Sequence, residues 1–246
     1  MADVAFEEIT IQVEGKSMPT FVALPKASGP RPAVLVFEEV FGVNVHIRDV
    51  CKRLAGEGYV AIAPDYHHRA WTPGTQLGYT PDDMKIGMAL IPKLTTDGLN
   101  ADIHATIAYL KTRKEADLAK LGAIGFCIGG HVAYYAAATQ PIVATASFYG
   151  GGIATFGFGG TQPTVERTGG IKGRIVCFFG AQDSHIPAES RDKIEQALTA
   201  HRVPHEIVVY ENAAHGFFCD QRGSYEPKAA ADAWERVKKL FAAELG

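Results

Sequence analysis

Residues 125–130 read Gly-Phe-Cys-Ile-Gly-Gly and join an apolar stretch, residues 121–126, to a segment with helical character, residues 128–139. Glycines on both sides of a central Cys127, at a turn from strand to helix, form the G-x-C-x-G version of a nucleophile elbow. The turn is so tight that β-carbons beside the central residue would collide. The pattern predicts that Cys127 projects above the sheet and that the Ile128 N–H faces a developing oxyanion. The positive end of the following helix favours a thiolate.

A cysteine at a strand end is often only a small buried residue, so the elbow needs partners. Asp183 follows the predicted strand 174–179, and His215 follows the predicted strand 205–210, before the last predicted helix. Singly, Asp183 could be a turn residue and His215 a surface histidine. Together, their order after the cysteine and their places at strand carboxyl ends predict a catalytic triad. His215 would take the thiol proton, and Asp183 would fix the tautomer of His215.

From residue 33 onward, apolar strand patterns alternate with helical ones, which predicts an α/β fold with a mostly parallel central sheet covered by helices on both faces. Two alternating runs at the start, with a turn at 14–16, predict an N-terminal antiparallel hairpin. We expect one domain, residues 1–246, with residues 67–95 as a lid-like excursion over the sheet. The hairpin is placed at 8–13 and 21–24, the parallel strands at 33–37, 59–63, 121–126, 142–149, 174–179 and 205–210, and the helices at 45–56, 96–113, 128–139, 188–201 and 226–244.

Composition restricts the function classes. A formal net charge of -3 provides no basic surface, so neither nucleic acid nor an anionic membrane is an expected partner. The start of the chain has neither the basic nor the apolar region of a signal peptide, and no apolar run could span a bilayer. The four cysteines include no C-x-x-C pair, so we expect a reduced, cytoplasmic protein with free thiols. The adjacent His67 and His68 are poorly spaced for one metal ion, and we expect neither a metal nor a cofactor.

The chain resembles the dienelactone hydrolase (carboxymethylenebutenolidase) family, a branch of the α/β-hydrolases, over nearly its whole length. An E-x-F-G-x-N sequence together with the cysteine elbow is highly specific for that family. The matching pieces are residues 38–44 (EEVFGVN), 58–65 (GYVAIAPD), 125–130 (GFCIGG), 148–150 (FYG) and 214–217 (AHGF).

The resemblance implies a role for Glu39. In the family, the matching glutamate contacts the resting cysteine, and substrate binding shifts it so that it takes the thiol proton. A carboxylate close to a thiolate favours a proton on one of the two, which makes this role physically reasonable. Without the resemblance, Glu38 and Glu39 read as ordinary loop acids. The resemblance also implies that the Val40 N–H joins that of Ile128 in the oxyanion hole.

One position departs from the family. Well-known members carry an arginine four residues after the triad histidine to bind a substrate carboxylate, and Cys219 stands there in this chain. Arg222 is nearby, and a second family arginine has only loose counterparts. This departure leaves the dienelactone substrate open, while the hydrolytic residues are unaffected. The candidates for substrate binding are Arg222, Lys93, Arg69 and Tyr149, and Lys85 is one further loose counterpart of the second family arginine.

We therefore expect a hydrolase that cleaves a lactone or ester of a small molecule through a cysteine thioester. The alternatives are a thioesterase or general carboxylesterase on the same scaffold, or a non-catalytic, redox-sensing thiol protein. For the oligomeric state, we expect a monomer or a weak homodimer.

Overall fold

Two packing units make up the chain, residues 1–121 and residues 122–246, and each is described by itself. The computed structural model describes residues 4–246. The first three residues, which begin the stretch predicted to lack a signal peptide, lie outside the described residues. The prediction of a single domain over residues 1–246 stays a prediction. No helix of the described residues has the length and apolar character to cross a bilayer.

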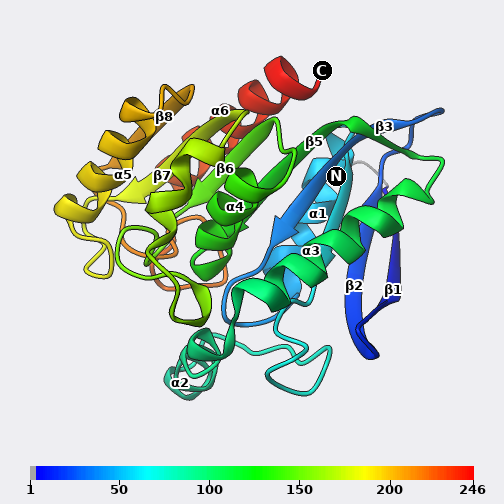
Figure 1. Ribbon diagram of the computed structural model, residues 1–246, viewed down its shortest axis with the longest axis horizontal. Helices are drawn as coiled ribbons and strands as arrows, with labels where there is room; N and C mark the ends of the chain where they lie inside the picture. The colour runs from blue at the N-terminus through cyan, green and yellow to red at the C-terminus, as the bar shows by residue number, and fades with distance from the viewer. Residues whose placement is uncertain (1–3) are drawn as a thin grey trace. The chain divides into compact units, whose positions relative to one another are not determined.

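The first unit is built around the predicted hairpin. Strand β1 (Ala5–Val13) pairs antiparallel with β2 (Lys16–Leu24). β2 pairs antiparallel with β4 (Val60–Pro64), which runs parallel to β3 (Arg31–Phe37). Helices α1 (Val45–Gly56) and α3 (Thr96–Lys111) cover opposite faces of these strands (Figure 1). The N-terminal hairpin is therefore confirmed, and α1 has the predicted bounds.

The excursion predicted at residues 67–95 contains a helix that the sequence analysis missed. Helix α2 (Pro81–Met88) begins at a capping box, in which Thr80 and Asp83 bond each other's backbone N–H groups. A short 3-10 helix, η1 (Ile91–Lys93), follows. The motif T-P-x-D could have revealed α2, because a capping residue followed by proline at the first helical position is a helix start.

The second unit holds the remaining parallel strands. Strand β5 (Ala116–Phe126) starts earlier than predicted and enters this unit at Gly122. β6 pairs in parallel with β5 and with β7, and β7 in parallel with β8. Helices α4 and α6 pack on β6 from opposite faces (Figure 1). The elements are β6 (Ala144–Phe148), β7 (Arg174–Gly180), β8 (His205–Tyr210), α4 (Ile128–Thr139), α5 (Ala188–Ala200), α6 (Pro227–Leu245), η2 (Phe158–Gly160) and η3 (Thr164–Gly170).

Candidate active site

The turn from β5 to α4 has a strained backbone. Cys127 occupies it with φ 56° and ψ -123°, a conformation that side-chain-bearing residues rarely adopt. A β-carbon on Gly125 would lie 1.9 Å from the carbonyl oxygen of Gly129, and one on Gly130 would lie 2.5 Å from that of Phe148. Glycine is therefore required at both positions, and for Gly125, which flanks Cys127 in the motif, this is the collision that the sequence predicts. Cys127 is partly exposed, whereas the other three cysteines are buried.

His215 and Asp183 lie on the loops after β8 and β7. The imidazole Nδ1 of His215 is 2.7 Å from Oδ2 of Asp183. The other oxygen, Oδ1, accepts the backbone N–H of His185 at 2.8 Å. Burial opposes ionisation of Asp183, but these bonds hold its pKa below the ordinary value. Asp183 is thus a carboxylate whose two oxygens both have donors, which fixes the orientation of His215.

The imidazole of His215 also makes a hydrogen bond to the Cys127 side chain. Burial by itself would lower the pKa of His215. The negative charge of Cys127 and the bond to Asp183 outweigh it and raise that pKa to about 10. Since Nδ1 faces Asp183, Nε2 is left for the sulfur. The three side chains predicted as a triad therefore lie together in the second unit.

Two further residues border His215. The ring of Tyr149, a predicted substrate-binding residue, meets the His215 ring edge-on at 5.1 Å, and its own backbone has φ 36°. The ring of His185 meets His215 from another side at 5.2 Å and is exposed. Sequence reasoning missed His185. Its position two residues after Asp183, in the turn that fixes the carboxylate, was the available signal.

Of the candidate cations, Arg222 is the one placed beside His215. A β-carbon on Gly216 would lie 2.4 Å from its Nη1, so the guanidinium lies against the chain directly after His215. Arg69 and Lys93 belong to the first unit. Arg69 pairs with Asp102 at 2.8 Å and with Glu14 at 2.9 Å. Lys93 donates to the Ala70 carbonyl at 3.3 Å. Substrate binding by these residues stays a prediction.

Glu39 and Val40 also belong to the first unit, in the loop that follows β3. Both are buried, at 1% and 0% exposure. Gly87 of α2 packs on Val40 so closely that a β-carbon there would lie 2.5 Å from the Val40 carbonyl oxygen. The roles of Glu39 and Val40 at the cysteine stay predictions from the resemblance. Ile128, the first residue of α4, follows Cys127 directly, as an oxyanion donor requires.

Comparison with solved structures defines the fold class of this chain. A crystal structure of a provisionally named dienelactone hydrolase from Klebsiella pneumoniae subsp. pneumoniae MGH 78578 matches at a TM-score of 0.86 and 34% identity, covering 97% of this chain and 98% of that one. An acylaminoacyl peptidase from Pyrococcus horikoshii matches at a TM-score of 0.77 over 100% of this chain and 42% of that one. At 13% identity, this second match shows the fold alone. The chain has the α/β-hydrolase fold.

The sequence comparisons narrow the class. A profile of the dienelactone hydrolase family matches residues 18–245. A Synechocystis sp. (strain ATCC 27184 / PCC 6803 / Kazusa) protein, provisionally named a carboxymethylenebutenolidase, is 44% identical over 99% of this chain and 98% of its own length. The chain belongs to the dienelactone hydrolase family, which confirms the resemblance drawn from the sequence.

Proposed function

We propose that this protein hydrolyses lactones or activated esters of small molecules, with Cys127 as the nucleophile. The observation that carries the proposal is the position of His215, which bonds Asp183 on one side and the Cys127 side chain on the other. Membership of the dienelactone hydrolase family supports the reaction class. A cysteine, an imidazole and a carboxylate in this order are the parts that acyl transfer through a thioester needs.

The reaction follows from the charges. The thiolate of Cys127 adds to the substrate carbonyl, and the backbone N–H of Ile128 donates to the resulting oxyanion. The His215 imidazolium then gives its proton to the alkoxide that leaves, which opens the lactone or releases the alcohol. A thioester remains on Cys127. Neutral His215 next takes a proton from water, the hydroxide adds to the thioester, and the sulfur departs as the thiolate.

A thiolate restricts the substrates. Collapse of the tetrahedral intermediate expels the better leaving group, and a thiolate leaves more easily than an amide nitrogen. Enol lactones, aryl esters and thioesters carry leaving groups that can compete with sulfur. We therefore expect these to be turned over, with amides inert.

We propose roles for two residues of the first unit, Glu39 and Val40. Following the resemblance, Glu39 takes the proton of a Cys127 that is still a thiol when substrate binds and passes it to His215, which gives the thiolate and imidazolium of the first step. The Val40 N–H is the second oxyanion donor. A reduced compartment, the cytoplasm, suits the four free cysteines.

The test is a panel of an enol lactone, an aryl ester, a thioester and a peptide, assayed with the wild-type protein and with Cys127→Ala. We expect turnover of the first three by the wild type, and an acyl adduct on Cys127 in rapidly quenched samples by intact mass. Cys127→Ala should give neither. Full activity of Cys127→Ala, or efficient peptide cleavage, contradicts the proposal. Peroxide oxidation of Cys127 without any turnover would favour the redox-sensing alternative.

A further inference from the structure

Two acidic side chains stand next to each other after β3, and they differ. Glu38 is 0% exposed, and neither of its carboxyl oxygens accepts a hydrogen bond of ordinary geometry from a donor among the described residues. Asp65, which follows β4 and is 1% exposed, lies beside it: β3 and β4 run parallel with Leu35 opposite Ile62, so the two acids follow their strands at matching positions, and the Asp65 charge acts on Glu38. Two buried carboxyl groups therefore face each other within the first unit. Both cannot be ionised without a large electrostatic cost, so one proton belongs to the pair.

The hydrogen bonds decide which carboxyl holds that proton. Asp65 accepts the backbone N–H of Gly74 at 2.7 Å, that of His67 at 3.1 Å, and the indole N–H of Trp71 at 3.4 Å. Such donors stabilise a carboxylate. Burial raises the pKa of Asp65 too, but its donors oppose that rise. Glu38 lacks comparable donors, and its burial, together with the Asp65 charge, raises its pKa well above the ordinary value. Glu38 is therefore the neutral acid of the pair.

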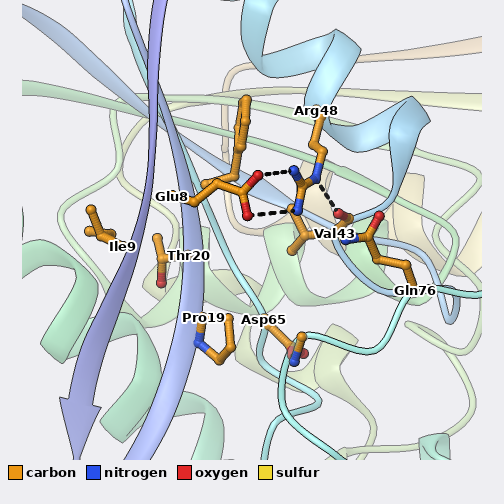
Figure 2. Close-up of a pocket in the computed structure, with 10 residues that line it drawn as sticks. Glu8, Ile9, Pro19, Thr20, Val43, Arg48, Asp65 and Gln76 are labelled. Carbon is orange, nitrogen blue, oxygen red and sulfur yellow. Dashed lines mark hydrogen bonds and ion pairs between the residues drawn. The ribbon is translucent and has the colours of Figure 1, made fainter.

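A nearby cation does not replace the proton. Asp65 and Arg48 both line a cavity of about 100 Å³, shown in Figure 2. Arg48 is occupied by the Glu8 carboxylate at 2.5 Å and by the Val43 carbonyl at 2.9 Å. The neighbouring His67 offers no positive charge to Glu38. Burial lowers the pKa of His67 to about 3, and His68 is 3.0 Å from Asp102.

The pair sits where two segments meet, the loop of residues 38–44 and the segment of residues 66–80. The Tyr66 hydroxyl donates to the Glu38 carbonyl at 2.6 Å. Further along, Leu77 N–H donates to the Phe41 carbonyl at 2.9 Å, and Asn44 Nδ2 donates to the Tyr79 hydroxyl at 3.0 Å. The 38–44 loop, which carries Glu39 and Val40, is thus held by the 66–80 segment, and Asp65 stands at the base of that segment.

We propose that Glu38 is a positioning residue: as a neutral acid, it donates a hydrogen bond to the Asp65 carboxylate and so fixes the 38–44 loop to the 66–80 segment. Through that loop it positions Glu39 and Val40, and its kinetic consequences rest on the proposed hydrolase function. The two adjacent glutamates then act in opposite protonation states. Glu38 acts while it holds its proton, whereas Glu39 acts by accepting one.

The kinetic test compares Glu38→Gln with Glu39→Gln, two identical changes at neighbouring buried positions. A carboxamide N–H can donate to Asp65 as the acid does, so Glu38→Gln should keep kcat and KM within about twofold. It should also remove the loss of activity at high pH that ionisation of Glu38 causes in the wild type. Glu38→Ala, which removes the donor, should lower kcat about tenfold or more with little change in KM, because small misplacements are costly. Glu39→Gln should lose activity at all pH values.

Equal damage from Glu38→Gln and Glu38→Ala would overturn the proposal. A second measurement does not depend on turnover. Infrared spectra at neutral pH should show the C=O band of one buried carboxylic acid in the wild type and in Glu39→Gln, and no such band in Glu38→Gln. If turnover is absent from every protein while this band behaves as expected, the proposed function fails and the carboxyl pair stands. A band that persists in Glu38→Gln refutes the pair itself.

Discussion

The turn at Cys127 and the 38–44 loop both carry candidate catalytic groups, but they are held in different ways. At Cys127, the glycines that permit the bend are sequence neighbours of the nucleophile, and a β-carbon on Gly125 would lie 1.9 Å from a backbone oxygen four residues away. The 38–44 loop depends on Asp65, Tyr66, Leu77 and Tyr79, which are distant in sequence. The turn at Cys127 is specified by residues close to it in sequence. The 38–44 loop, in contrast, takes its conformation only when the 66–80 segment packs against it.

The largest effect should come from Gly125→Ala, which disturbs the turn at Cys127. The added methyl group would overlap the Gly129 carbonyl, with no flexible side chain to move aside, so we expect a loss of more than about 4 kcal/mol in unfolding free energy and the loss of Cys127 reactivity. Urea denaturation and thiol alkylation measure the two. The matched control is Gly151→Ala, where nothing lies within 4 Å of the new β-carbon and the change should stay within about 1 kcal/mol. Equal stabilities of the two variants would contradict a strained, glycine-dependent turn.

The second largest effect should come from Asp183→Asn, which alters the catalytic residues without disturbing the fold. Asp183→Asn should leave His215 in the wrong tautomer, because an amide can donate where the carboxylate only accepts. We expect kcat to fall by about 10²- to 10⁴-fold with little change in stability, measured with an aryl ester and by thermal melting. His185→Asn is the control, since the backbone N–H that Asp183 accepts is retained. Activity of Asp183→Asn near the wild-type level would remove Asp183 from the proposed mechanism.

The third effect is the titration of His215. Burial favours the neutral ring, but the Cys127 charge and the Asp183 bond favour the protonated one, and they raise the pKa to about 10. His215 should therefore stay an imidazolium through neutral pH and lose its proton only near pH 10, as followed by ring NMR signals. In Cys127→Ala, the largest contribution that raises the pKa is gone, so His215 should titrate at a lower pH. The same titration in both proteins would show that no thiolate–imidazolium pair forms.

Much of the fold was predictable because its signals are local. The apolar runs at β3, β7 and β8 and the helical pattern of α1 lie within single elements, and their predicted bounds agree with the structure to within about two residues. The early start of β5 was missed because Asp117 and Lys120 interrupt the apolar pattern that predicts a buried strand. Helix α2 was missed because its apolar residues are few and Ile86 and Met88 are exposed, so no amphipathic period marks it.

The residues of the candidate site also differ in how far the sequence could predict them. Cys127, Asp183 and His215 were found because each follows a recognisable strand, and parallel strands bring their carboxyl ends together. The support for Glu39 and Val40 could not be found, because it depends on side chains of an irregular segment whose path no periodicity reveals. For the same reason, Glu38 read as an ordinary loop acid, and the Asp65 carboxyl beside it became visible only in the structure.

The smallest effect should come from disturbing the non-local region through α2. A β-carbon on Gly87 would lie 2.5 Å from the Val40 carbonyl oxygen and 2.8 Å from its Cγ2, so Gly87→Ala must push the helix and the loop apart. Overpacking of this kind costs about 1–3 kcal/mol, partly offset because alanine favours the helix. If the Val40 N–H is an oxyanion donor, kcat should fall a few-fold while KM changes little. Met88→Ala, at an exposed position of the same helix, is the control for α2 itself and should leave kcat unchanged. A Gly87→Ala protein with lowered stability and unchanged kcat would separate α2 from catalysis and leave the Ile128 N–H as the sole donor of the proposed mechanism.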